Sequence, residues 1–162
     1  MSPLPPPQVL QAQFASRLEE TTALLDWLER GRPAGVEPLL WIQAQTALVE
    51  GFTNAVRHAH GTLACPPPVE VTLEVTPDLL RLMIRDQGRP FDLTAAWEPL
   101  VPLDDAAPPM VGLQALPERE AHWGLLMLNR LRHDHGWQIS YRTLASGGNE
   151  LLLAHDLHAP RL

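Results

Sequence analysis

The sequence of 162 residues has no lysine, a single cysteine and no apolar run as long as a membrane-spanning helix. The one cysteine, Cys65, excludes an intrachain disulfide and a thiolate metal cluster. Because every basic side chain is an arginine, any contact with a phosphate must come from arginine or from backbone N–H groups. The first ten residues lack the charged and apolar regions of a signal peptide, so we expect a cytoplasmic protein that neither enters nor binds a membrane.

What the sequence does contain favours one globular domain over residues 1–162. Hydrophobic residues make up 45% of the chain, which argues against disorder. The formal net charge is −7, and a surface of that sign does not suit direct binding to nucleic acid.

The N-terminal half predicts two helices and three strands. A Pro-rich, extended lead-in covers residues 1–7. The remaining predictions are an edge strand at 8–14, a helix from a cap at Ser16 to a stop at Gly31, a long helix from about Leu39 to His60 ended by Gly61, and strands at 69–75 and 79–86 around a turn at 76–78.

The C-terminal half begins with a Pro-rich stretch, residues 93–120, which we interpret as a lid or binding segment, or else as disordered. A helix from His122 to about Arg132 and a hairpin of strands 137–144 and 149–155 follow. The sum is an α/β fold, a two-layer sandwich of a mixed, largely antiparallel sheet with helices on one face.

Within the long predicted helix, Glu50, Asn54 and His58 recur at intervals of four. At about 100° per residue they share one face of the helix. Alone, this pattern is more typical of a solvated face than of a functional site. The pairs His58/His60 and His133/His135 lack a third ligand and favour structural roles over metal binding.

Three further motifs are individually weak. The strand at 79–86 ends in Asp86, and Gly88 follows, either as an ordinary turn or as a place where a ligand approaches the backbone. Gly124 is predicted to open a helix, whose N-terminus would offer free N–H groups to phosphate. The turn at 146–148 feeds the last strand at Asn149.

In this order and spacing, the motifs resemble the nucleotide-binding fold shared by gyrase-type ATPases, Hsp90, histidine kinases and mismatch-repair ATPases. Within that group, E-G-F-T-N-A-V-R-H (50–58) is most similar to the serine/threonine kinase-type anti-sigma factors of bacteria. D-Q-G-R-P-F-D (86–92), W-G-L-L-M-L (123–128) and G-N-E-L-L-L (148–153) are similar to further boxes of the same family. The resemblance covers roughly residues 10 to 157.

The resemblance implies ATP and Mg²⁺ as cofactors and assigns roles. Glu50 would be the general base, and Asn54 would hold Mg²⁺ through its carbonyl oxygen. Asp86 would bind the adenine amino group, and Gly88 would leave room for the ring. The other nucleotide-binding residues that it implies are Arg57, His122, Gly124 and Asn149, and residues 93–120 would be the ATP lid.

The sequence departs from this family at residues 121–124, which read A-H-W-G. The family has two glycines separated by one residue here, so His122 stands at the first and only Gly124 remains. Either His122 supplies a side-chain donor to phosphate, or the phosphate cradle is incomplete.

The sequence therefore predicts two alternative functions. The first is an ATP-dependent serine/threonine kinase and anti-sigma factor that phosphorylates a small anti-anti-sigma partner. The second is a binding module of the same fold that sequesters a sigma factor or another protein without phosphotransfer. An ATPase domain serving a histidine-kinase-like partner ranks third, and homodimerisation is left open.

Overall fold

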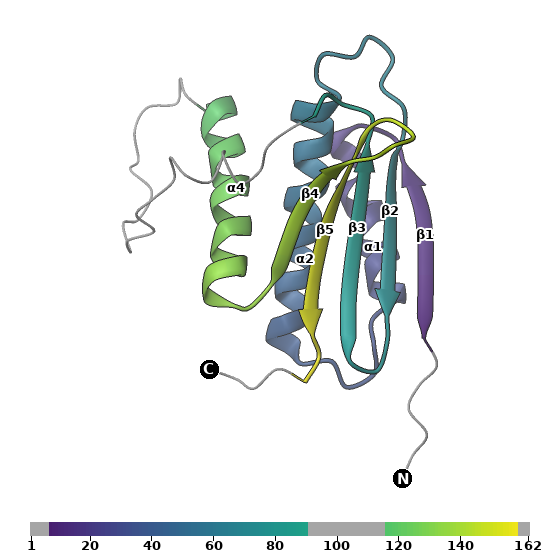
Figure 1. Cartoon of the computed structure of the whole chain (residues 1–162), viewed down its shortest axis with the longest axis vertical. Coiled ribbons are helices and arrows are strands. Elements are labelled where there is room, and N and C mark those ends of the chain that lie inside the picture. Colours follow the sequence, from purple (N-terminus) through teal and green to yellow (C-terminus); the bar gives the residue numbers. More distant parts are fainter. Residues whose placement is uncertain (1–6, 91–115, 159–162) are drawn as a thin grey trace.

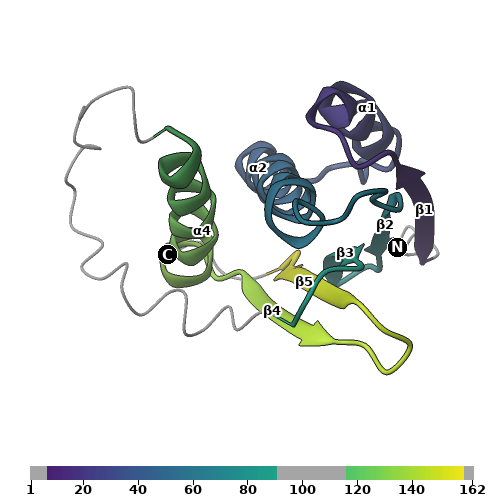
Figure 2. The ribbon, with the colours of Figure 1, turned by 90° about the horizontal axis from the view of Figure 1, so that it is seen from above.

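The computed structural model describes residues 7–90 and 116–158, with the backbone alone for residues 116–123. Five strands form one sheet in the order β1-β2-β3-β5-β4, and all four pairings are antiparallel. The strands are β1 (Gln8–Phe14), β2 (Val69–Val75), β3 (Leu79–Asp86), β4 (Gln138–Thr143) and β5 (Asn149–Asp156). The helices α1, α2 and α4 lie on one face of this sheet (Figures 1 and 2), which confirms the predicted two-layer α/β fold.

The helical layer consists of α1 (Thr21–Arg30), preceded by a short 3₁₀ turn η1 (Leu18–Glu20), the central helix α2 (Pro38–Asn54) and α4 (Leu116–Asp134). The side chain of Glu37 caps α2 by accepting a hydrogen bond from the Leu40 N–H at 3.1 Å, and Pro38 occupies the first turn. The cap of α1 is Glu20, so the predicted cap at Ser16 is wrong, whereas Gly31 ends the helix as predicted.

The strict alternation of β2 explains the core. Val69, Val71, Leu73 and Val75 are buried, and the intervening side chains face the other side of the sheet. On β3 the same alternation buries Leu80, Leu82 and Ile84 and, last of the series, Asp86. The apolar face of the sheet therefore ends in a carboxylate at the edge where the helices leave a cavity.

The predicted long helix ends in a π turn, η2 (Ala55–Ala59), that continues α2 without a break. The N–H of His60 donates to the carbonyl of Ala55 at 2.9 Å, a five-residue step that widens the helix. π turns inside α-helices occur frequently at functional sites. Here the turn lies beside the end of β3.

The predicted start of the last helix is wrong. It was placed at His122 with Gly124 at the opening, but α4 begins at Leu116. The residues from Glu118 to Trp123 contain neither proline nor glycine, so nothing interrupts the helix before Gly124. Residues 1–6 and 91–115, which hold most of the Pro-rich lead-in and of the lid-like segment, lie outside the described residues. Among the described helices, none is long and apolar enough to cross a membrane.

Candidate functional site

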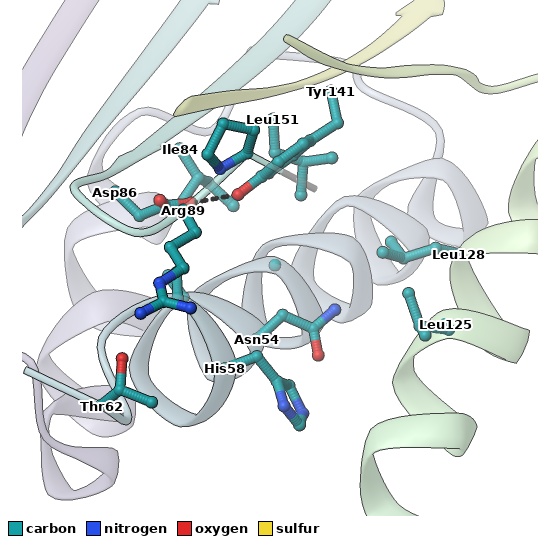
Figure 3. Close-up of a pocket in the computed structure, with 14 residues that line it drawn as sticks. Asn54, His58, Thr62, Ile84, Asp86, Arg89, Leu125, Leu128, Tyr141 and Leu151 are labelled. Atoms are coloured by element: carbon teal, nitrogen blue, oxygen red, sulfur yellow. Dashed lines mark hydrogen bonds between the residues drawn. The ribbon is translucent and has the colours of Figure 1, made fainter. Parts of the chain in front are cut away.

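A cavity of about 340 Å³ lies between the sheet and the helical layer (Figure 3). Its sheet side is formed by Ile84, Asp86, Tyr141 and Leu151 with the loop residues Arg89 and Pro90, and its helical side by residues of α2, η2 and α4. Most of the lining side chains are apolar. A flat apolar ring with a few polar edges is the kind of ligand that such a cavity suits.

Asp86 is the buried anion of this cavity, with 3% of its surface exposed. Its Oδ1 accepts hydrogen bonds from the backbone N–H of Gly88 at 2.9 Å and from Nδ2 of Asn149 at 2.9 Å. Its Oδ2 accepts a hydrogen bond from the hydroxyl of Tyr141 at 2.6 Å. The carboxylate is thus held in one orientation by three donors while it still lines the cavity.

Asn149 holds the loop after β3 in place. It is fully buried and stands opposite Asp86 in the β3–β5 ladder. Its amide nitrogen also lies 3.1 Å from the carbonyl oxygen of Gly88 and 3.0 Å from that of Arg89. Asn149 therefore acts on the cavity through Asp86 and the loop, and it is not among the described residues that line the cavity.

Tyr141 is a site residue that the sequence reasoning missed. Burial raises the pKa of its phenol far above the ordinary value, and the hydrogen bond to Asp86 acts in the same direction. The hydroxyl consequently remains a donor at physiological pH. No local signal in the sequence marks this role, because the partner Asp86 lies 55 residues away along the chain.

The glycine after Asp86 is required by packing within the site. A Cβ at Gly88 would lie 2.6 Å from both Cα and O of Ala59, which is itself a lining residue on η2. The close approach predicted at Gly88 thus exists, but its partner here is the protein backbone. Gly148 has φ +78° and lies against the carbonyl oxygen of Asp86, so a Cβ at this position would collide with that oxygen.

Glu50 and Asn54 face α4 from the neighbouring helix. A Cβ at Gly124 would lie 2.5 Å from Oε2 of Glu50 and 3.4 Å from Oδ1 of Asn54, so both side-chain oxygens point to the same place. Burial raises the pKa of the Glu50 carboxyl, and the charge of Arg57 opposes this effect. Asn54 also lines the cavity, so it connects the Glu50 side with the Asp86 side.

His58 and Arg57 lie in other places than their predicted roles imply. His58, interpreted as structural, is exposed and lines the rim of the cavity, and partial desolvation lowers the pKa of its imidazole, with a further contribution from Arg57. Arg57, predicted to contact phosphate, is not among the described lining residues. Arg89 instead supplies an arginine to the cavity wall (Figure 3).

His60 joins the three parts of the structure that meet at the site. It is buried, its Nδ1 lies 3.0 Å from Oγ of Ser16, and its Nε2 accepts a hydrogen bond from the N–H of Gln87 at 2.8 Å. Since Nε2 accepts, the proton of the neutral ring is on Nδ1. Within residues 7–90 and 116–158, no group of three or more His, Cys, Asp and Glu side chains is placed to hold a metal ion.

The predicted phosphate contact at Gly124 needs a correction. Gly124 lies in the interior of α4, so its N–H is not one of the free donors of a helix N-terminus. His122 falls in the part of α4 for which only the backbone is described, and its role stays a prediction.

A family model, described as histidine kinase-like ATPase domain, matches residues 14–154. This range includes every described residue that lines the cavity. Among curated proteins, none matches the sequence.

Proposed function

The chain belongs to the histidine kinase-like ATPase domain family, and from this premise we propose that it is a serine/threonine kinase and anti-sigma factor that phosphorylates a small anti-anti-sigma partner. Membership of the family implies that the cavity binds ATP, usually together with Mg²⁺. The substrate and the regulatory role are the proposed parts. They rest on the similarity of residues 50–58 to the anti-sigma kinases and on the side chains at the cavity.

The residues present fit the two cofactors. The apolar walls suit a purine ring, and Asp86 offers a buried acceptor for a base amino group. Asn54 lines the cavity and offers a carbonyl oxygen, and Mg²⁺ in phosphotransfer sites is commonly held by one or two protein oxygens together with water and phosphate. When bound, Mg²⁺ would neutralise phosphate charge.

Glu50 carries the catalytic part of the proposal. A serine or threonine hydroxyl needs a general base to accept its proton, and a carboxylate with a raised pKa is a stronger base than an exposed one. The single observation that supports transfer best is that Asn54 lines the cavity that contains Asp86, while Glu50, one turn earlier on α2 and not among the described lining residues, points with Asn54 toward Gly124. In this proposal Asp86 recognises the base, and Glu50 accepts the proton of the attacking hydroxyl.

The test is phosphotransfer from Mg-ATP to a candidate anti-anti-sigma partner, read as phosphoserine or phosphothreonine by mass spectrometry. We expect transfer by the wild type, loss of transfer with retained nucleotide binding for Glu50→Gln, and loss of both for Asp86→Ala. A folded wild-type protein that binds ATP and transfers no phosphate to its cognate partner would contradict the kinase assignment.

A second candidate, the binding module without phosphotransfer, is favoured by one observation. In this structure Gly124 is enclosed in α4 directly against Glu50, so neither the free N–H groups of a phosphate cradle nor open space at the proposed base is present at that point. Such a protein would sequester its sigma factor by surface contact alone.

Thermal unfolding separates the two candidates. A ligand at one hundred times its dissociation constant stabilises the native state by about 2.7 kcal/mol. We expect Mg-ADP to raise the melting temperature of the wild type and to leave that of Asp86→Ala unchanged. Sigma-factor binding with no nucleotide-dependent shift would favour the sequestering module.

A further inference from the structure

The hydrogen bonds of Asp86 determine how many further donors its carboxylate can accept. An ionised carboxylate has about four acceptor positions, two on each oxygen. Gly88 and Asn149 take both positions of Oδ1, and Tyr141 takes one position of Oδ2. Counting the donors within residues 7–90 and 116–158, a single position, on Oδ2, is therefore left for a ligand in the cavity.

The donor on Oδ2 is fixed. Tyr141 is partly buried, lines the cavity beside Asp86, and its hydroxyl lies 2.6 Å from Oδ2 (Figure 3). Its phenol keeps its proton at neutral pH, since burial raises its pKa far above the ordinary value. Water or ligand cannot use that position on Oδ2 without displacing a short, charge-assisted hydrogen bond.

Purine edges differ in how many donors they present. Adenine presents one exocyclic amino group next to a ring nitrogen that only accepts. Guanine presents a ring N–H and an amino group side by side, and a carboxylate with two free oxygens binds such a pair bidentately. Because Oδ1 of Asp86 is saturated, that bidentate mode is closed here, and both donors of guanine would have to share Oδ2, where the hydroxyl of Tyr141 leaves one position.

We propose that Tyr141 is a specificity-determining residue of this site: by occupying one position of Oδ2 and fixing the carboxylate plane, it restricts Asp86 to one ligand donor and so selects a 6-aminopurine over a guanine nucleotide. This inference rests on the proposed nucleotide-binding function and extends it to the identity of the base. In Tyr141→Phe, Oδ2 gains a second open position and can accept both donors of guanine, while Gly88 and Asn149 still occupy Oδ1.

The experiment is isothermal titration of the full chain with ADP and with GDP, each with Mg²⁺, for the wild type, Tyr141→Phe and Thr143→Val. Thr143 is the matched control, because it lies on the same strand and its hydroxyl contacts Asn149 at 3.4 Å, but it is not among the described lining residues. We expect the wild type to prefer ADP, and the ratio of the ADP to the GDP affinity to fall about tenfold or more in Tyr141→Phe, the scale of one hydrogen bond to a charged group. Thr143→Val should keep the wild-type ratio.

The outcomes separate the two levels of the proposal. If Tyr141→Phe weakens ADP and GDP by the same factor, or leaves both unchanged, Tyr141 does not select the base, and this inference is wrong while nucleotide binding stands. If the wild type binds neither nucleotide, the proposed function fails and takes this inference with it. Thermal unfolding of each variant without ligand verifies that the proteins compared are folded.

Discussion

Asn149 stands directly opposite Asp86 across strands β5 and β3, and its amide nitrogen lies 2.9 Å from Oδ1 of that carboxylate. The same nitrogen contacts the carbonyl oxygens of Gly88 and Arg89. One fully buried side chain thus ties the end of one strand, the loop that follows it and the start of another strand together. The contact is made within the protein, before any ligand is considered.

We predict that Asn149→Leu, which keeps the side-chain size and removes the amide, lowers the free energy of unfolding by about 1–3 kcal/mol, because buried acceptors lose their donor. Urea denaturation monitored by tryptophan fluorescence measures it. Thr72→Val is the control, since Thr72 accepts a hydrogen bond from Gln11 at the exposed face of the sheet. Equal effects of the two changes would mean that the amide of Asn149 adds nothing to stability.

Gly124 offers a second prediction, in the form of a double-mutant cycle with Glu50. In an ordinary helix interior, Gly→Ala stabilises by about 1 kcal/mol. Here the added Cβ would lie 2.5 Å from Oε2 of Glu50, so we expect Gly124→Ala to show little or none of that gain. In a Glu50→Ala background, the nearest remaining atom is Oδ1 of Asn54 at 3.4 Å, and the full gain should return.

The cycle is measured by chemical denaturation of the four proteins. Additive effects, with the same gain in both backgrounds, would show that α4 does not pack against Glu50 as the structure has it. The result is independent of any catalytic role of Glu50, because only the free energy of unfolding is compared.

His60 predicts a pH dependence of stability. Burial lowers the pKa of its imidazole below the ordinary value of 6.5, and the charge of Asp86 opposes this. As the pH falls below about 6.5, the unfolded chain takes up a proton that the native imidazole refuses, so the native state loses stability until the pH reaches the native pKa. Above about 6.5, His60 adds no pH dependence.

Comparison of the wild type with His60→Gln measures this contribution. The free energy of unfolding of the wild type should fall more steeply between pH 6.5 and 5 than that of the variant. His58 also has a lowered pKa, so the slope that remains in His60→Gln should decrease further in the double variant with His58→Gln. Parallel curves for the wild type and His60→Gln would contradict the assignment.

The sequence predicted the fold well where local pattern and tertiary structure agree. Strict alternation placed β2, and an apolar extended run placed β3, at their observed bounds. The start of α4 was mistaken since a glycine was interpreted as a helix boundary. The carboxylate of Glu50 lies against Gly124, and a contact of that kind, between residues more than seventy positions apart, leaves no local signal.

Some residues of the site could likewise be identified from the sequence and others could not. Asn54 and Asp86, which line the cavity, could be named from the sequence because each belongs to a short motif. Tyr141 could not, since its partner Asp86 is 55 residues away and the two meet only through the order β3-β5-β4. Arg57 was predicted to contact phosphate because of its position in the motif. The described cavity wall contains Arg89 instead, and the path of the loop after β3 brings that residue to the wall.

Glu50 gives the last prediction, on the rate of the proposed phosphotransfer. A general base acts in its ionised form, so the rate should rise with pH through the pKa of Glu50 and then level off. Since burial raises that pKa, the inflection should lie above the ordinary carboxyl value of 4.5. Arg57 opposes the effect of burial, so Arg57→Ala should move the inflection to still higher pH.

The measurement is the single-turnover rate of transfer from pH 4.5 to 8 at saturating Mg-ATP. Arg81→Ala is the control for the lost charge, since Arg81 pairs with Glu74 and is not a described lining residue of the cavity. It should leave the inflection in place, and Glu50→Gln should abolish the pH-dependent rate. An inflection that Arg57→Ala does not move would mean that the titrating group is not Glu50, because the charge of Arg57 acts directly on that carboxylate.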